Sequence, residues 1–424
     1  MLEGDPLLNA LARILAGLPL KEGDTLYNVT QTEDWNKHAA ELNRMWANST
    51  VTLDKVSAIR DNDFGDITAR AQNVFYSFSG PDFPFMATFF PKAKTYYMMG
   101  LERAGTPITA KEFGKKTYDK YQKALLDLLR RSYFITSYMS SDLHNSEIDG
   151  TVPIFMVLMA RMGYEIISID FQSLTNEGEW VDSEKKSPFV RIRFFRPEEN
   201  EEKTLYYLCT NLLDKEFDPK VQAMIDKIDA DATVSFVKSC SYCLHYGTFS
   251  QIREDILKHS FAVVQDDTGI TYNTLVNRGW KTILYGQYTH PIDLFSSSVY
   301  QKSLDQAYTT RDDIRPLGFR FGIPLGPLPV SPFISTSFHI RKPIYHWIDL
   351  EIGHHYSWID DSGDGAAAID EWEFVPLLGA GLEISRHFSF EFQWYLGSFC
   401  IYNGSFNEAY EYGSSWRLKF EAAF

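Results

Sequence analysis

A serine, a glycine and two carboxylates stand at the ends of predicted strands, where chemistry often takes place. The segment Ser79-Gly80-Pro81-Asp82 follows a predicted strand at 73–78, and Glu102 follows one at 95–101. Glycine lets a phosphate approach the backbone, and an acid about 20 residues later can hold a ribose, so this layout is similar to a nucleotide-binding βαβ unit. A single glycine also fits a tight turn with a helix cap. Both interpretations stay open.

Paired carboxylates follow a third predicted strand, at 261–265. Asp266 and Asp267 could bind a metal ion or serve as acid and base, and the run Asp267-Thr268-Gly269 is similar to an aspartic protease loop. That chemistry requires a second matching loop, which the sequence lacks. A plain turn is the alternative.

Ligands of open α/β sheets bind at the carboxyl ends of the strands. If the protein is a transferase or hydrolase, we therefore expect its cleft to be formed by five side chains: Ser79, Asp82, Glu102, Asp266 and Asp267. Convergence of the five in one concave pocket, with a buried carboxylate, favours an enzyme; scatter favours a binding role.

An acidic loop near residue 360 has the spacing of a calcium site. Asp360, Ser362 and Asp364 occupy positions 1, 3 and 5, Gly365 occupies position 6, and Glu371 occupies position 12. The flanking residues are β-like, so a helix-loop-helix hand is not expected. A lone calcium loop between two strands and a solvated acidic turn are the two interpretations.

Cys240 and Cys243 form a C-x-x-C pair, which fits a redox pair or half of a zinc site. No second pair follows at the spacing of a zinc finger, so two small buried residues at a helix entry are the alternative. His245 could be a base or a ligand, or a hydrogen-bonded core histidine. His354 and His355 are adjacent on a predicted strand and face opposite ways, so they cannot share one ion.

The elements that must position these residues follow from the hydrophobic pattern of the first 308 residues. Nearly all-apolar strands separated by helices predict an α/β fold, with a mixed sheet and helices on both faces. The hairpin at 198–203 indicates the mixed character. We expect helices at 5–17, 33–48 and 109–131, the last opened by a Thr109-x-x-Glu112 capping box. We expect strands at 73–78, 95–101, 164–171, 189–195, 204–210, 233–237, 261–265 and 281–288.

A boundary is predicted at 309–316, because helical periodicity ends there. The remaining 317–424 predicts an antiparallel all-β region of about six strands, at 317–323, 331–340, 346–358, 374–384, 388–397 and 415–424. Apolar and polar residues alternate to the terminal Phe424, and short turns alternate with long loops, a pattern that resembles outer-membrane β-barrel proteins. Six strands are fewer than the eight of the smallest single-chain barrels. Two missed strands, a barrel shared between chains as a homo-oligomer, and a soluble sheet with one buried face are the alternatives.

Residues 8–308 resemble an uncharacterised family of exported bacterial proteins, periplasmic or lipid-anchored. The matching stretches are LARILAGL (11–18), FYSFSGPDF (75–83), FFP (89–91), GLE (100–102), VKS (237–239) with His245, QDDTG (265–269), YGxYxxPI (285–292) and Tyr300-Gln301. Cys240 and Cys243 depart from the small or aliphatic residues expected there. The resemblance implies export and carries no activity.

Composition limits the partners. The 424 residues carry a formal net charge of -15 without a cluster of Lys and Arg, which excludes nucleic acid. No run of about 18 apolar residues occurs, and 7–20 is expected to be an amphipathic helix and not a signal peptide. The sequence therefore predicts a non-catalytic protein of the bacterial cell envelope, in the periplasm and outer membrane, that binds envelope proteins. A transferase or hydrolase, and a soluble two-domain binding protein, are the alternatives; the sequence names no ligand, substrate or native targeting signal.

Overall fold

The computed structural model describes residues 2–109, 113–131, 140–288, 290–292, 295 and 298–315, and beyond them the backbone of the strands given below. The chain divides into two compact units. The first contains Met1–Thr282 and Tyr288–Thr310, and the second contains Ile283–Gln287 and Arg311–Phe424.

The first unit is built on an eight-stranded sheet with the order β4-β3-β5-β6-β2-β1-β7-β8. The strands are β1 (Asn73–Tyr76), β2 (Thr95–Gly100), β3 (Glu165–Leu174), β4 (Trp180–Asp182), β5 (Phe189–Phe195), β6 (Glu202–Cys209), β7 (Thr233–Val237) and β8 (Ala262–Gln265). Neighbours from β6 to β8 run parallel, whereas β4, β3, β5 and β6 pair antiparallel. The predicted α/β fold with a mixed sheet is thus confirmed for this unit, including the hairpin between β5 and β6.

Apolar residues on both sides of the strands explain why the sheet is covered on both faces. In β1, Val74 and Tyr76 belong to one hydrophobic core, whereas Phe75 belongs to a second. In β6, Leu205 belongs to the first core and Leu208 to the second. Because successive side chains of a strand point to opposite faces, a strand buried on both sides must be apolar throughout.

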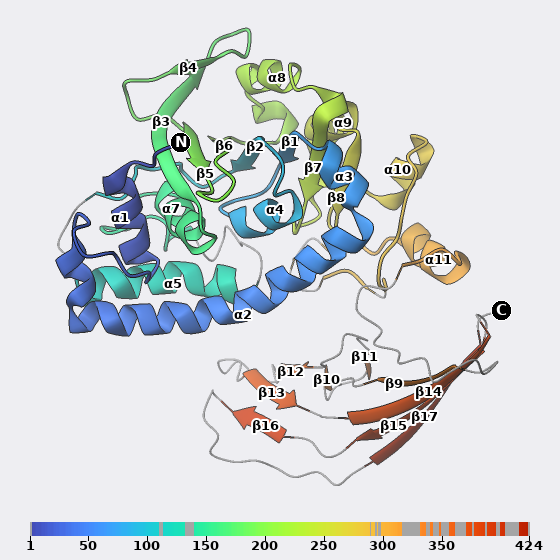
Figure 1. The fold of residues 1–424 in the computed structure, drawn as a ribbon. Helices are drawn as coiled ribbons and strands as arrows, with labels where there is room; N and C mark the ends of the chain where they lie inside the picture. Colours follow the sequence, from blue (N-terminus) through green and yellow to red (C-terminus); the bar gives the residue numbers. More distant parts are fainter. Residues whose placement is uncertain are drawn as a thin grey trace. The chain divides into compact units, whose positions relative to one another are not determined.

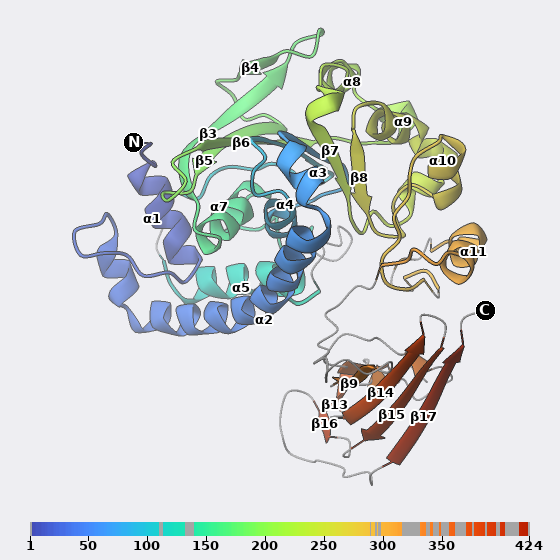
Figure 2. The ribbon, with the colours of Figure 1, turned by 45° about the vertical axis from the view of Figure 1, so that its right-hand side comes forward.

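Helices supply the two outer layers (Figures 1 and 2). The first core contains residues of α1 (Pro6–Leu15), α2 (Glu33–Asp63), α4 (Phe83–Phe89), α5 (Lys115–Arg131) and α7 (Val152–Arg161). The second core contains residues of α8 (Pro219–Ile225) and α9 (Ser250–Lys258). Among the described residues of this unit, the other helices are α3 (Gly65–Arg70), α10 (Tyr272–Asn277) and α11 (Lys302–Thr310). The short 3-10 turns described are η1 (Tyr27–Gln31), η2 (Asp214–Glu216), η3 (Ala230–Ala232), η4 (Cys243–His245) and η5 (Gly247–Phe249).

One predicted strand and the predicted start of one helix are wrong. The segment 281–288 forms no strand, and its backbone makes only an isolated bridge between Tyr285 and Arg315. Helix α5 begins at Lys115, so Thr109 does not cap it; Glu112 of the expected capping box lies outside the described residues. Side-chain caps are present at α1 and α2, where Asp5 and Thr32 accept hydrogen bonds from backbone N–H groups of the first turn.

The second unit contains β9 (Ser331–Ser335), β10 (Ile340–Arg341), β11 (Trp347–Ile348), β12 (Tyr356–Asp360), β13 (Asp370–Phe374), β14 (Leu377–Ser385), β15 (Phe388–Tyr395), β16 (Phe399–Tyr402) and β17 (Ser415–Ala422). One sheet has the order β17-β15-β14-β9, and the register of β15 and β17 pairs Phe390 with Phe420 and Trp394 with Trp416. The predicted strand 317–323 lies outside the described residues. The all-β, barrel-like architecture stays a prediction. Among the described residues, no helix has the length and apolar character that crossing a bilayer requires.

Candidate functional site

The order of the parallel strands in the sheet reverses between β1 and β7. From β1 the chain passes through α4 to β2 on one side, and later it passes from β6 through α8 to β7 on the other side of β1. The carboxyl ends of β1 and β7 therefore meet at a topological switch point, which is where open α/β sheets bind ligands. The predicted residues Ser79, Asp82, Glu102, Asp266 and Asp267 follow β1, β2 and β8 at this edge.

A buried ion pair joins the two strand ends at the switch point. The Nζ atom of Lys238, just after β7, lies 2.5 Å from Oδ2 of Asp82, and the side chains are 15% and 3% exposed. The hydroxyl of Tyr76 donates to the same oxygen over 2.9 Å. The ammonium group also lies 3.9 Å from the ring centroid of Phe85 on α4. Lys238 and Tyr76 were not among the predicted site residues. Lys238 is 156 residues from Asp82, which leaves no local signal in the sequence.

Burial dominates the electrostatics of this pair. It raises the pKa of Asp82, while the Lys238 ammonium and the Tyr76 hydroxyl act in the opposite direction. The pKa of Tyr76 is raised by burial and further by the charge of Asp82, so its hydroxyl is a proton donor at neutral pH. The second carboxylate oxygen of Asp82, Oδ1, is buried and makes no hydrogen bond of normal geometry with the described residues. The backbone N–H of Phe85 also acts to lower the pKa of Asp82.

The loop after β7 has an unusual backbone. Ser239, Ser241 and Tyr242 have φ values of 53°, 55° and 60°, and Phe78 after β1 has a φ of 59°. Non-glycine residues in this left-handed region cost about 1–3 kcal/mol each, and such residues cluster at functional sites. The surrounding structure must therefore hold this loop in place.

Asp266 supplies much of that support. Its Oδ2 accepts a hydrogen bond of 2.8 Å from the backbone N–H of Ser239. Its Oδ1 accepts from both the backbone N–H and the hydroxyl of Thr268, whose hydroxyl in turn accepts from the N–H of Cys240 over 2.8 Å. The carboxylate of Asp266 thus braces the strained loop.

Asp267 is directed to different partners. Its Oδ2 accepts a hydrogen bond of 2.7 Å from the hydroxyl of Tyr242, which accepts one from the N–H of Ile292. Burial raises the pKa of Asp267, and the charge of Asp266 raises it further. The paired carboxylates therefore accept from different groups of the loop after β7, the backbone N–H of Ser239 and the hydroxyl of Tyr242.

Ser79 and Glu102 belong to the contact between the ends of β1 and β2. The hydroxyl of Ser79 donates to the carbonyl of Met99 over 2.9 Å. A Cβ atom added at Gly100 would lie 2.7 Å from both Oε2 of Glu102 and the hydroxyl oxygen of Tyr207, and 3.3 Å from Cα of Gly80, so a larger residue there would displace these side chains. Glu102 is buried. The serine hydroxyl is engaged with the backbone, as expected for the turn interpretation.

The C-x-x-C pair matches the structural interpretation. Burial raises the pKa of both thiols, that of Cys240 far above its usual range, so neither is a thiolate at neutral pH. The thiol of Cys240 donates to the carbonyl of Thr268 over 2.5 Å, and Cys243 begins the short turn η4. Both cysteines are free thiols.

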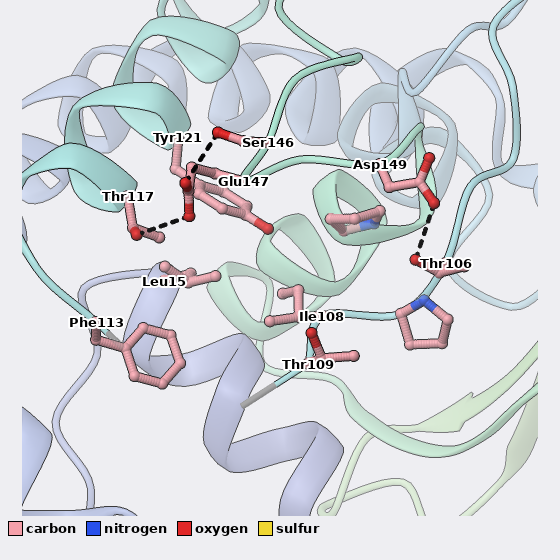
Figure 3. A pocket seen from close by; sticks show the side chains of 12 residues that line it. Leu15, Thr106, Ile108, Thr109, Phe113, Thr117, Tyr121, Ser146, Glu147 and Asp149 are labelled. Carbon is pink, nitrogen blue, oxygen red and sulfur yellow. Dashed lines mark hydrogen bonds between the residues drawn. The ribbon is translucent and has the colours of Figure 1, made fainter. Parts of the chain in front are cut away.

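A pocket lies elsewhere, between α1, α5 and the segment that follows β2 (Figure 3). Its lining contains none of the five predicted cleft residues. Its apolar wall is formed by Leu15, Pro107, Ile108, Phe113, Tyr121 and Pro153. Sequence reasoning missed this pocket because its wall comes from segments far apart in the chain.

Two carboxylates form the polar side of the pocket. Glu147 accepts hydrogen bonds from the hydroxyls of Thr117 and Ser146, at 3.1 and 3.0 Å, and its Oε1 lies 3.0 Å from Nζ of Lys116 (Figure 3). The hydrogen bond from Lys116 lowers the pKa of Glu147 the most. The carboxyl group is therefore charged at neutral pH.

The second carboxylate, Asp149, accepts from the hydroxyl of Thr106 over 3.0 Å and from Nζ of Lys186 over 2.5 Å. Burial acts to raise its pKa, but these two hydrogen bonds outweigh burial, and the pKa is lowered. The backbone below is closely packed: a Cβ atom at Gly105 would lie 1.4 Å from the carbonyl oxygen of Asp149, and Gly105 has a φ of +76°. This side of the pocket is therefore held in position.

The predicted calcium loop is largely outside the described residues, which do not include Ser362 and Asp364. Asp360 and Glu371 are described as backbone positions of the paired strands β12 and β13. Calcium binding stays a prediction.

Comparison of the chain with protein-family models, with curated proteins and with solved structures finds no match.

Proposed function

We propose that the α/β unit is a non-catalytic binding module that takes a small molecule into the pocket beside α5. The observation that carries this proposal is the lining of the pocket, which combines an apolar wall with a few fixed polar groups, as small-molecule sites do. The predicted catalytic side chains do not line it, and three of them, Ser79, Asp266 and Asp267, have structural hydrogen bonds.

The lining indicates the class of ligand. Glu147 and Asp149 are charged acceptors, and Phe113 and Tyr121 offer ring surfaces. A ligand that donates hydrogen bonds from hydroxyl or amino groups and has an apolar face satisfies both sides of the pocket. Monosaccharides and amino sugars have this chemistry.

Ligand-observed NMR with a panel of neutral, amino and acidic monosaccharides tests the proposal. We expect binding of a neutral or amino sugar, reduced at least tenfold by Glu147→Gln, which removes a charged acceptor, and abolished by Thr109→Trp, which fills the pocket. Glu177→Gln, an exposed change outside the pocket, is the matched control. Binding that is insensitive to both pocket variants, or confined to acidic sugars, would contradict the proposal.

A transferase or hydrolase is the second candidate, favoured by the buried pair of Asp82 and Lys238 at the switch point. Turnover of chromogenic phosphate, ester or glycoside substrates that disappears in Asp82→Asn, with the protein still folded, would support it. Retained turnover in this variant would exclude Asp82 from the reaction.

We also propose, on the sequence pattern and the family resemblance alone, that the protein belongs to the bacterial envelope and that 317–424 faces the outer membrane or envelope proteins. Cell fractionation combined with heat-modifiability on a gel tests this placement. A protein that fractionates with the cytoplasm and does not shift on heating would contradict it.

A further inference from the structure

Two helices that cover the second face of the sheet end beside each other with three metal-ligating side chains. Asp226 caps the carboxyl end of α8, and Asp255 and His259 stand at the end of α9. One ligand atom from each side chain lies within 4.8 Å of the other two. From the geometry we propose that these three residues bind a divalent transition-metal ion, with Zn²⁺ as the reference ion.

Helical geometry places two of the ligands on one side of α9. Asp255 and His259 are four residues apart, and the backbone N–H of His259 donates to the carbonyl of Asp255 over 2.9 Å. Side chains at i and i+4 lie above one another on a helix, which is a spacing that metal-binding helices use.

Burial and missing partners point to a ligand. Asp255 and His259 are 5% and 6% exposed. Oδ2 of Asp255 and Nε2 of His259 are buried and accept or donate no hydrogen bond among the described residues. The Nε2 atom lies 3.4 Å from Oδ1 of Asp226, so it faces the carboxylate across the proposed site. Buried polar atoms are rarely left without a partner, and a metal ion would satisfy both.

A second layer of contacts orients the ligands. Nε2 of Gln222 donates to Oδ1 of Asp255 over 2.9 Å, which leaves Oδ2 for a metal ion. Gln222 is itself held by Nε2 of Gln251. Outer hydrogen bonds of this kind fix the orientation of metal-binding carboxylates.

The ligand chemistry selects the class of ion. One imidazole with two carboxylates suits Zn²⁺, Mn²⁺ or Fe²⁺ better than Ca²⁺, which prefers six to eight oxygen ligands. The side chain of Asp226 is 46% exposed, so solvent reaches the site and water completes the coordination. Nζ of Lys258, 3.2 Å from Asp226 and 67% exposed, is free to turn into solvent when an ion binds.

The position of the site indicates a structural role. Helices α8 and α9 lead into β7 and β8, so their carboxyl ends lie at the edge of the sheet opposite to the switch point. An ion bound here would tie the two helices together and stabilise this half of the sheet without contacting the pocket beside α5.

Calorimetric titration and thermal unfolding of the full chain with Zn²⁺, Mn²⁺, Mg²⁺ and Ca²⁺ test the proposal, after treatment with EDTA. We expect one Zn²⁺ per chain and a rise in Tm of about 5 °C at roughly 100 times the dissociation constant, with Mg²⁺ and Ca²⁺ inactive. The affinity should fall at least tenfold in Asp255→Asn, His259→Gln and Asp226→Ala. The last variant changes a half-exposed residue, so it is the one to rely on if the buried variants do not fold.

Two controls separate this site from other ligands. Glu254→Gln makes the same chemical change one residue away on α9, at a side chain that pairs with Arg278, and should bind Zn²⁺ normally. The double variant Cys240→Ser, Cys243→Ser should also bind normally. Loss of Zn²⁺ in the cysteine variant, unchanged affinity in Asp226→Ala, or no binding at millimolar Zn²⁺ would each overturn the proposal.

Discussion

The ammonium group of Lys238 lies 2.5 Å from the carboxylate of Asp82 and joins the end of β7 to the end of β1 across the switch point. Replacement by methionine removes the charge and keeps most of the side-chain volume. Because a buried carboxylate is left unpaired, Lys238→Met should lower the free energy of unfolding by roughly 3–5 kcal/mol, measured by urea denaturation.

The matched control for this change is Lys227→Met, which removes a surface partner of Glu179 and should cost less than about 1 kcal/mol. The double variant Asp82→Asn, Lys238→Met should recover part of the loss, since no unpaired charge remains. Equal effects of Lys238→Met and Lys227→Met on the free energy of unfolding would show that the buried pair contributes no more than a surface pair.

A buried histidine makes stability depend on pH. The ring of His38 is stacked on Tyr118 at 4.4 Å; Nε2 lies 3.0 Å from the carbonyl of Leu15, and Nδ1 lies 3.1 Å from Nε2 of Gln122. These contacts fit the neutral ring that donates from Nε2. Burial lowers the pKa of His38 from 6.5 to about 4.

Since the folded-state pKa is lowered, the contribution of His38 is complete above pH 6.5 and is lost as the pH falls through about 4. The difference corresponds to roughly 3 kcal/mol at most. Denaturation curves at pH 7 and pH 4 should show that His38→Gln loses less stability over this interval than the unaltered protein. Parallel losses in the two proteins would contradict the prediction.

Substitution of two glycines with the same backbone conformation distinguishes the cost of backbone strain from the cost of steric overlap. Gly105 and Gly163 have φ values of +76° and +78°, but a Cβ atom would meet the carbonyl of Asp149 only at Gly105. Gly163→Ala should cost about 1–2 kcal/mol from the left-handed conformation alone. Gly105→Ala should cost at least about 2 kcal/mol more, or prevent folding, because backbone cannot yield as a flexible side chain does. Equal costs in urea denaturation would show that the loop below the pocket is not rigid.

The brace formed by Asp266 can be tested through a neighbouring thiol. Asp266→Ala removes the acceptors for Ser239 and Thr268, so the loop after β7 should open more often and expose Cys240. We expect alkylation of Cys240, followed by mass spectrometry, to become at least about tenfold faster, in line with the loss of buried hydrogen bonds. Asp266→Asn keeps one oxygen acceptor, so its rate of Cys240 alkylation should lie between the rates of the unaltered protein and of Asp266→Ala. An unchanged rate in Asp266→Ala would contradict the assignment.

Two strands were predictable to the residue. The predicted segments 189–195 and 233–237 coincide with β5 and β7, which are rich in aromatic and β-branched residues and end before the charged residues Arg196 and Lys238. The three-residue strand β4 was missed, since it is mostly exposed and exists by pairing with β3. The apolar run at 281–288 was predicted as a strand, but it pairs with no strand of the described sheet.

The candidate sites were less accessible to sequence reasoning than the fold. The sequence placed Asp82 at a strand end, and the structure agrees, but its partner Lys238 can be found only once β7 is known to lie beside β1. The pocket depends in the same way on Leu15, Thr117 and Glu147 coming together from three distant segments. The local sequence pattern does not predict such contacts between distant residues.

Strand β1 is paired on one side with β2, which follows after some 20 residues, and on the other with β7, where Asn73 meets Thr233. During synthesis the central strand therefore keeps one edge of unpaired backbone N–H and C=O groups until about 160 further residues have left the ribosome. Fragments that end before β7 would present that edge to other chains and aggregate. A fragment expressed to obtain this unit must therefore extend beyond Val237.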